Sequence, residues 1–143
     1  MAISEIFDAR SDPEHLGVYA GQAIRAPADR TTWLNNMVLG LEARGVTPIL
    51  PGASPPGSAH SVRFVVEKAW VAHAHDDIGA GVLLRLDELR DGRTTQFRFR
   101  GAKQKMVYFS ANVSKTETAL NSAVGEALDA MAAHLRESCG LAA

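Results

Sequence analysis

The stretch from residue 79 to residue 101 reads GAGVLLRLDELRDGRTTQFRFRG and predicts a β-hairpin. Apolar and polar residues alternate on both arms, which is the pattern of strands that cover a core with one face only. The arms meet at Asp91-Gly92, a dipeptide that suits the positive backbone angles of a tight hairpin turn. Side chains on a strand alternate between its two faces. We expect Val82, Leu84, Leu86, Phe97 and Phe99 to face the core, and Arg98 and Arg100 to face solvent.

A second long strand is predicted just before this hairpin. Residues 61–75 read SVRFVVEKAWVAHAH, in which apolar residues return at every second position over most of the length. Lys68 interrupts the apolar face, so it marks either a β-bulge or a sheet edge. The residues expected on the inward face are Val62, Phe64, Val66, Trp70, Ala72 and Ala74.

Two amphipathic helices are predicted, one before and one after these strands. The first begins after Asp29, a residue suited to capping, and ends near Gly45. The second begins with Ser114-Lys-Thr-Glu117, the spacing of a reciprocal capping box, and ends near Glu137. Each helix carries one apolar stripe at helical spacing. The stripes are Leu34, Met37, Val38 and Leu41 in the first helix, and Leu120, Val124, Leu128, Met131 and Leu135 in the second.

Shorter segments complete a single domain. Residues 2–7 and residues 47–50 are predicted to be short strands, whereas residues 17–30 allow either a strand or an ordered loop. Residues 51–60, PGASPPGSAH, are rich in Pro, Gly and Ser and predict a flexible internal loop. Strands around two separated amphipathic helices predict an α+β fold for residues 1–143. We expect a mostly antiparallel sheet with both helices packed on one face, in a two-layer sandwich.

Length, charge and cysteine content limit the classes of function. The 143 residues fit one domain with a core of its own. The formal net charge is −1, from 15 basic and 16 acidic residues, so the molecule has no overall field that would gather nucleic acid or an anionic membrane. A lone cysteine, Cys139, excludes an internal disulfide and a multi-cysteine metal site. No apolar run approaches the ~20 residues of a membrane-spanning helix, and MAISEIFDAR lacks the features of a secretory signal.

Three local strings resemble the YajG-like family of bacterial envelope lipoproteins, and more distantly other small envelope and ABC-transport auxiliary lipoproteins. FDARSDPEHLGV, residues 7–18, is similar to the family's strand that ends in Asp-x-Arg before an acidic turn. RDGRTTQFRFRGAK, residues 90–103, is similar to the family's hairpin, which closes in a Gly. TALNSAVGEALDAMAAHLRE, residues 118–137, is similar to its closing helix, including the pair Leu120-Asn121.

The resemblance implies a protein of the cell envelope that faces the periplasm and is held by lipid to a membrane, such as the outer membrane. The resemblance brings no well-defined biochemical activity to this chain. We expect no cofactor, and we expect action by binding or assembly with a protein partner whose identity stays open. A lipoprotein begins with an acylated cysteine, and no cysteine lies near Met1. We therefore expect the signal and lipobox to be trimmed from this chain. Monomer and homo-oligomer both stay open, since an exposed strand edge or Cys139 would support the latter.

The run of acids and arginine near the amino terminus has two interpretations, a structural corner or a reactive site. Asp8 and Arg10 are two residues apart, so on an extended chain they share a face and can pair. Asp12 precedes Pro13 and can bond its own backbone, as turn-forming residues do. Acid-base catalysis would need an apolar pocket that raises the pKa of one carboxyl, and nothing nearby supplies one. We interpret Asp8, Arg10 and Asp12 as a structural motif, with ligand binding or catalysis as the alternative.

His73, His75 and Asp77 are the best metal candidates in the sequence. Alternate histidines on a strand point the same way, and a carboxylate follows at once. These residues lie where the strand runs into its turn, and no other histidine has a spacing that would complete the set. We therefore expect adventitious metal binding or none, with a small metal-dependent enzyme that uses these three residues as the alternative.

A local excess of positive charge lies in the hairpin region, residues 85–105, where seven basic residues outnumber three acidic ones. Such a face would suit an anionic lipid or glycan, bound through Arg93, Arg98, Arg100 and Lys103. A ligand-binding domain of this kind is the second function hypothesis. The alternative is a solvated outer face whose arginines keep a sheet edge from aggregating. Nucleic acid is not expected, because exposed aromatic residues are not interleaved with these charges.

The sequence carries no catalytic signature. It has no Gly-x-Ser-x-Gly elbow, and no phosphate-cradling glycine loop follows a strand. Trp33 and Trp70 are expected to be packing residues rather than a stacking platform. We therefore predict that the protein is not an enzyme, and we assign no catalytic residue.

Overall fold

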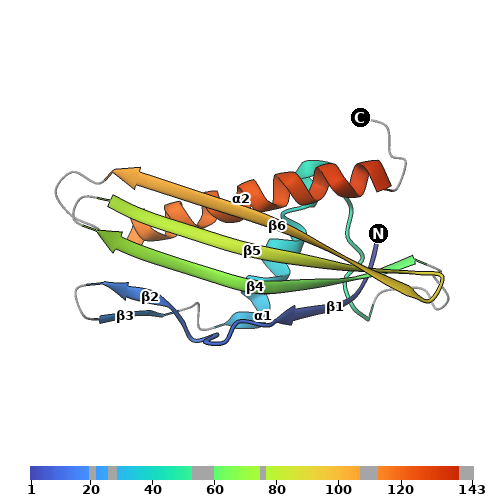
Figure 1. Cartoon of the computed structure of the whole chain (residues 1–143), viewed down its shortest axis with the longest axis horizontal. Coiled ribbons are helices and arrows are strands. Elements are labelled where there is room, and N and C mark those ends of the chain that lie inside the picture. Colours follow the sequence, from blue (N-terminus) through green and yellow to red (C-terminus); the bar gives the residue numbers. More distant parts are fainter. Residues whose placement is uncertain (20–21, 26–28, 53–59, 75–76, 107–112, 139–143) are drawn as a thin grey trace.

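The computed structural model describes residues 1–19, 22–25, 29–52, 60–74, 77–106 and 113–138. These residues form a four-stranded sheet, a layer of helices and a small two-stranded sheet (Figure 1). The elements are β1 Ala2–Asp8, β2 His15–Tyr19, β3 Gln22–Arg25, α1 Arg30–Leu39, the 3₁₀ helix η1 Glu42–Arg44, β4 His60–Ala74, β5 Asp77–Arg90, β6 Arg93–Met106 and α2 Val113–Ser138. The α+β class and the mostly antiparallel sheet predicted from the sequence are confirmed.

The strands of the larger sheet lie in the order β1-β4-β5-β6. β5 runs antiparallel to both β4 and β6, whereas β1 runs parallel to β4. The turn between β5 and β6 consists of Asp91 and Gly92, whose φ angles are 51° and 74°. These positive angles belong to the tight turn that the dipeptide predicts. The hairpin predicted for residues 79–101 is present and extends beyond that stretch at both ends.

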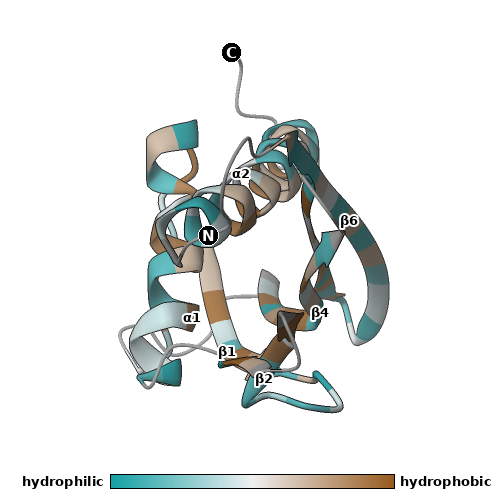
Figure 2. Ribbon diagram, turned by 90° about the vertical axis from the view of Figure 1, so that its left-hand side faces the viewer, coloured by the Kyte–Doolittle hydropathy of each residue, from teal (hydrophilic) through white to brown (hydrophobic). Residues whose placement is uncertain are grey.

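Both helices lie on one face of the larger sheet (Figure 2). α2 packs along β5 and β6, and its predicted apolar stripe is buried against them. Gly101 in β6 permits this close packing, because a Cβ atom there would collide with the backbone carbonyl of Ala123 in α2. Asp29 caps α1 by accepting a hydrogen bond of 3.0 Å from the backbone N–H of Thr32. The buried faces of the helices and the sheet form a hydrophobic core.

A β-bulge in β4 reverses which side chains face the helices. The register with β5 shifts between Val66 and Lys68, which leaves Glu67 as the extra residue. The buried apolar side chains on the helix-facing side are Val62, Phe64 and Val66 before the bulge, and Ala69 and Val71 after it. The prediction that Trp70 and Ala72 face inward was wrong, because both are exposed. One inserted residue shifts a two-residue period by one position and so exchanges the two faces.

Residues 17–30, for which the sequence allowed a strand or a loop, contain most of the β2–β3 hairpin. This hairpin lies beside the last part of β4, beyond the end of β1 (Figure 1). Gly17 permits the approach, since its φ of 155° disfavours a side chain and a Cβ atom would collide with the backbone carbonyl of Val71. β1 and β2 therefore follow one another along the same edge of β4.

Three predictions about individual elements need correction. The first helix, predicted to end near Gly45, ends at Leu39, and the short 3₁₀ helix η1 follows it. Residues 47–50 form no strand, and only a single parallel bridge joins Ile49 to Ala2. α2 begins at Val113, so Ser114 lies inside the first turn and not at the capping position of the predicted box. Other predictions fall outside the described residues: these are residues 53–59 of the loop predicted at 51–60, the side chain of Ala74, and Cys139.

Candidate functional site

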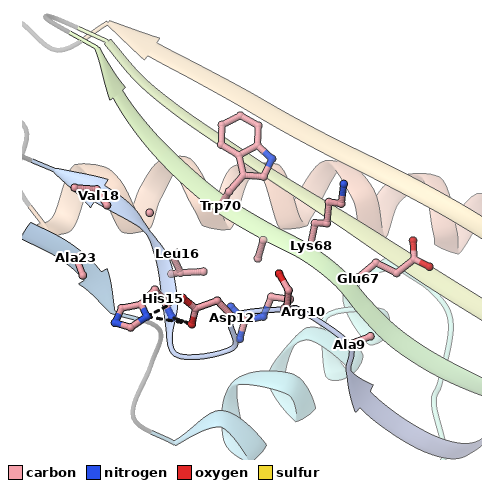
Figure 3. A pocket seen from close by; sticks show the side chains of 13 residues that line it. Ala9, Arg10, Asp12, His15, Leu16, Val18, Ala23, Glu67, Lys68 and Trp70 are labelled. Atoms are coloured by element: carbon pink, nitrogen blue, oxygen red, sulfur yellow. Dashed lines mark hydrogen bonds and ion pairs between the residues drawn. The ribbon is translucent and has the colours of Figure 1, made fainter.

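The chain turns between the end of β1 and the start of β2, at residues 8–15, and this segment is called the corner. A groove of about 700 Å³ lies where the corner and the β2–β3 hairpin meet the middle of β4 (Figure 3). Lys68 and Trp70 project from β4 on one side of the groove, and Asp12 and His15 lie on the other. The remaining lining residues are Ala9, Arg10, Ser11, Leu16, Gly17, Val18, Ala23, Glu67 and Ala69. The groove thus joins an exposed aromatic ring, a cation and an acid-imidazole pair.

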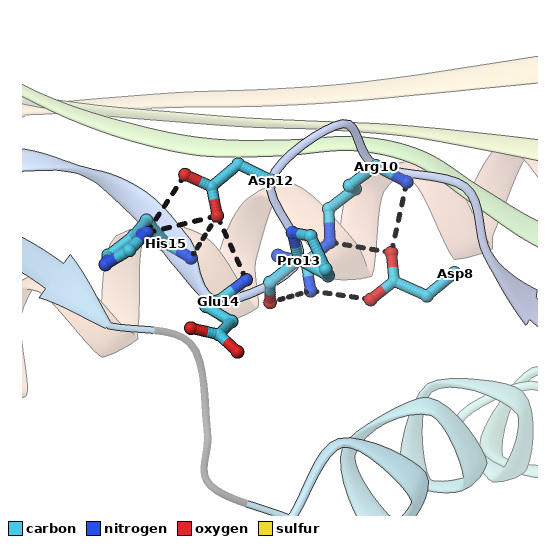
Figure 4. A network of polar contacts seen from close by, with 6 residues as sticks. All are labelled: Asp8, Arg10, Asp12, Pro13, Glu14 and His15. Carbon is cyan, nitrogen blue, oxygen red and sulfur yellow. Dashed lines mark hydrogen bonds and ion pairs between the residues drawn. The ribbon is translucent and has the colours of Figure 1, made fainter.

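The first half of the corner contains a buried ion pair between Asp8 and Arg10 (Figure 4). Nε and Nη2 of Arg10 donate to the two carboxylate oxygens of Asp8 at 2.8 and 2.7 Å. Nη2 also donates to the carbonyl of Pro13 at 2.8 Å. The guanidinium carbon lies 4.9 Å from the ring centroid of Trp33 in α1. Only 3% of the Arg10 side chain and 6% of the Asp8 side chain are exposed, so the pair joins strand, turn and helix.

This environment keeps the Asp8 carboxyl ionised. Burial by itself would raise the pKa of Asp8, but the hydrogen bonds and the positive charge of Arg10 outweigh it and leave the pKa below its usual value. A carboxylate in this state accepts hydrogen bonds and does not supply protons near neutral pH.

Asp12 forms the second half of the corner (Figure 4), and it is one of the residues that line the groove. Its Oδ1 accepts hydrogen bonds of 3.2 Å from the backbone N–H groups of Glu14 and His15. The Nδ1 atom of His15 lies 2.9 Å from Oδ2 of Asp12. The side-chain hydrogen bond with His15 is the main cause that lowers the pKa of Asp12. Asp12 therefore closes a turn with its own neighbours, in solvent contact.

Glu67, the extra residue of the bulge, binds two arginines of the neighbouring strands. Its Oε1 lies 2.7 Å from Nη1 of Arg85, and its Oε2 lies 2.9 Å from Nε of Arg98. The hydrogen bonds from Arg98 and then Arg85 outweigh burial and lower the pKa of Glu67. Arg85 also pairs with Asp87 at 2.8 Å. These two arginines are therefore neutralised within the sheet.

Trp70 lies on the outer face of the sheet and covers Gly81, its cross-strand neighbour in β5. A Cβ atom at position 81 would lie 2.5 Å from two carbons of the indole and 2.6 Å from its Nε1. This contact was not predicted, because the two-residue period of β4 put Trp70 in the core. The signal was present in Gly79-x-Gly81, two glycines on one face of a strand that faces a tryptophan across the hairpin register.

The four basic residues proposed for an anion-binding hairpin face do not share one face. Side chains alternate along β6, whose pairing with β5 is regular throughout. Arg98 and Arg100 therefore lie on the outer face, whereas Arg93 and Lys103 lie on the opposite one. Because Glu67 pairs with Arg98, Arg100 is the member of this set that faces outward without a carboxylate partner among the described ion pairs.

The metal candidates are also separated. His73 faces α2, where its Nε2 lies 3.3 Å from Oγ1 of Thr116, and burial lowers the pKa of its imidazole. Asp77 lies on the opposite face of the sheet and accepts a hydrogen bond of 2.9 Å from Gln104. His75 lies outside the described residues. Within the described ranges, no cluster of three or more His, Cys, Asp or Glu side chains is placed to hold a metal ion.

Comparison with known proteins relates the chain to solved structures by fold. Neither a family model nor a curated protein matches the sequence. A crystal structure of a Xanthomonas campestris protein, described with the family model DUF330, matches with a TM-score of 0.62 at 12% identity, over 98% of this chain and 87% of that chain. A structure of an uncharacterised protein gives a TM-score of 0.54 at 10% identity, over 96% of this chain and 91% of that one.

A Caulobacter crescentus structure, described as that of a candidate lipoprotein, gives a TM-score of 0.42 at 10% identity, over 86% of this chain and 85% of that one. This score is too low to support a conclusion. At 12% and 10% identity, the first two matches show a shared fold over nearly the whole chain. In the part of the chain that the structure describes, no helix combines the length and apolar character needed to cross a bilayer.

Proposed function

We propose that this protein is a non-enzymatic domain of the bacterial cell envelope, lipid-anchored in its native form and facing the periplasm, which acts by binding or assembly. The observation that carries the proposal is the agreement between three YajG-like sequence strings and the elements that they form. The shared fold with the Xanthomonas campestris DUF330 structure supports it over 98% of the chain.

The three strings form the kinds of element that the resemblance implies, and we take this as support for the proposal. Residues 7–18 form the end of β1, the corner and most of β2. Residues 90–103 contain the tight turn and most of β6, and residues 118–137 lie within the closing helix α2. A strand end with its turn, a hairpin and a closing helix, in this order, support the proposal.

A structural role for Asp8, Arg10 and Asp12 is part of the proposal. The Asp8–Arg10 pair is buried, bidentate and stacked on Trp33, which is the environment of a group that holds backbone segments together. Asp12 bonds the backbone of its own turn. The corner thereby sets the direction in which the chain leaves β1 and enters β2 along β4.

The electrostatics of the groove favour binding over acid-base chemistry. The pKa of Asp8, Asp12 and Glu67 is lowered in each case, by hydrogen bonds from Arg10, from His15 and from Arg98 that outweigh burial. A general acid at neutral pH needs a raised carboxyl pKa. We therefore assign the groove and the adjoining outer face of β4 to recognition.

The test is made on the native full-length protein in its own cells. The envelope is fractionated after growth with a clickable fatty-acid analogue, and the intact mass of the mature protein is measured. The proposal predicts that the protein is labelled, that it sediments with membranes, and that its mass exceeds that of the polypeptide by the diacylglyceryl group and any further acyl chain.

A precursor whose lipobox cysteine is replaced by serine is the control, and it should lose both the label and the membrane fraction. An unlabelled cytoplasmic protein with the mass of its unprocessed chain would overturn the envelope proposal. After that result, only the α+β fold of the protein would stand.

A further inference from the structure

We infer that the outer face of the sheet holds a binding site for an acidic saccharide, a sugar ring that carries a carboxylate or a phosphate, built from Trp70, Lys68 and Arg100. The inference rests on the proposed function, because the bacterial envelope is where acidic saccharides are abundant. It names a ligand class for the binding surface and uses residues outside the ion pairs described above.

Trp70 supplies a flat platform for the ring. A Cβ atom at Gly81 would be nearly equidistant, at 2.5 to 2.6 Å, from three atoms of the indole, and one at Gly79 would lie 3.6 Å from Cζ3. The indole therefore lies along the β5 backbone with one face covered. Because Trp70 is 41% exposed, the other face is open to solvent. The C–H face of a pyranose packs on such a surface, since polarised hydrogens are attracted to the negative face of an aromatic ring.

Lys68 and Arg100 flank the position beside this platform. Lys68 in β4 pairs with Leu83 in β5, and Leu83 pairs with Arg100 in β6. Directly paired residues point to the same face of a sheet, so all three side chains lie on the outer face. Trp70 and Gly81 form the next outward-facing row of the sheet. Two strand spacings separate the two cations by about 10 Å along the sheet, and the rows are about 7 Å apart. Both long side chains can therefore reach one anionic group held above Leu83 while its ring rests on Trp70.

Two positive charges of this surface take part in no ion pair among the described residues. Arg85 and Arg98 also face outward, but Glu67 binds both of them. Among the ion pairs of the described residues, none includes Lys68 or Arg100, and both side chains are exposed. Two positive charges on either side of Leu83 complement an anion held between them, and an arginine forms bidentate hydrogen bonds to carboxylate or phosphate.

The shape of the surface favours a saccharide over a lipid bilayer. Small residues stand in the row of Trp70, namely Gly81 and Ala102, and in the next row along β4 and β5, namely Ala72 and Gly79, and they leave a low shelf on this side of the ring. Trp70 and Lys68 project from the same side of β4 (Figure 3), and the indole lies along the sheet. Binding to a bilayer surface instead uses apolar side chains that enter the acyl region. A single ring with one acidic substituent fits this shelf.

The experiment measures binding of two acidic probes, tetragalacturonate and mannose 6-phosphate, to the intact chain by isothermal titration calorimetry at low ionic strength. The matched neutral probes are the methyl ester of tetragalacturonate and mannose. We expect binding of at least one acidic probe and none of its neutral counterpart. Lys68→Gln and Arg100→Gln should each weaken binding about tenfold, which is the loss of one charge-assisted contact.

Lys103→Gln is the matched control, because it removes the same charge from β6 on the opposite face. It should weaken binding less than about twofold, through general electrostatics alone. Trp70→Ala should weaken binding about tenfold, and Trp70→Phe should retain part of the affinity because a smaller ring remains. If Trp70→Ala fails to fold, Trp70→Phe and the two charge variants still test the site.

Failure of both acidic probes to bind would overturn the inference. Equal effects of Arg100→Gln and Lys103→Gln would also overturn it, since binding would then follow net charge and not the site. Vesicles containing phosphatidylglycerol are the third arm. If they bind through Lys68 and Arg100 while neither sugar binds, the face recognises lipid and the inference is wrong. The two proposals fail separately. If the protein is acylated but binds neither sugar, this inference is wrong and the proposed function stands. If it binds sugar but is not acylated, the lipid anchor is wrong.

Discussion

The indole of Trp70 lies over Gly81 so closely that a Cβ atom at position 81 would come within 2.5 Å of the ring. The two residues are cross-strand partners on β4 and β5. The tryptophan covers a length of backbone that has no side chain to protect it, and its own backbone position is set by the bulge at Glu67. The relationship therefore links the β-bulge of β4 to the exposed ring at the centre of the proposed site.

Replacing Gly81 with Ala should displace the indole and lower the free energy of unfolding by about 1–3 kcal/mol, the cost of overpacking. Gly79→Ala is the control, because its Cβ would make ordinary contact with Trp70 at 3.6 Å. Chemical denaturation measures both variants. In a Trp70→Ala background the cost at position 81 should disappear, and an unchanged cost there would show that the indole is not its cause.

Gly101→Ala should force α2 away from β6, because the new Cβ would collide with the carbonyl of Ala123. The expected loss in the free energy of unfolding is about 3 kcal/mol, at the upper end of overpacking. Hydrogen exchange of α2 amides should increase in the same variant. Gly125→Ala is the matched control in α2 itself, since its Cβ would meet only the flexible end of Arg44 at 3.4 Å. That helix-interior change should be neutral or stabilise by up to ~1 kcal/mol, and an equal loss in both variants would contradict the explanation.

Asp8→Asn should lower the free energy of unfolding by about 3–5 kcal/mol at neutral pH, because it leaves the buried Arg10 without a countercharge. Asp12→Asn, in the exposed half of the same corner, should cost much less. The pKa of Asp8 is lower in the folded state than the usual 3.8. The pair therefore stabilises the fold fully above that value, and this contribution is lost as the pH falls through the folded-state pKa. Denaturation curves against pH should thus fall more steeply in acid for the wild type than for Asp8→Asn, and parallel curves would argue against the pair.

Glu67→Gln should release Arg85 and Arg98 from their shared carboxylate. We expect a loss of about 1 kcal/mol in the free energy of unfolding, since one of the two pairs is half exposed. The affinity for tetragalacturonate should rise about two- to threefold, because the released Arg98 adds positive charge next to Lys68 and Arg100. Calorimetry measures this change. Glu5→Gln, which frees Arg63 farther along the sheet, is the control, and an equal rise in that variant would contradict a local effect.

Features that depend on neighbouring residues were predictable from the sequence. The turn at Asp91 and Gly92, the cap at Asp29 and the apolar stripes of both helices follow from backbone preferences and from periodicity within one element. The proximity of Asp8 and Arg10 was also local, since the two residues share a face of an extended segment. Lys68 was recognised as a break in the β4 pattern, although the sequence did not distinguish a bulge from an edge.

The sequence by itself determined the β5–β6 hairpin, the long strand before it, the presence of two helices and the α+β class, because each of these depends on interactions between residues close in the chain. Only the tertiary structure decided that Trp70 faces outward over Gly81, that His73 and Asp77 lie on opposite faces, and that Lys68 and Arg100 share a face across β5. The physical reason is register. One extra residue at Glu67 exchanges the two faces of β4, and its position is set by pairing with a strand that lies elsewhere in the chain.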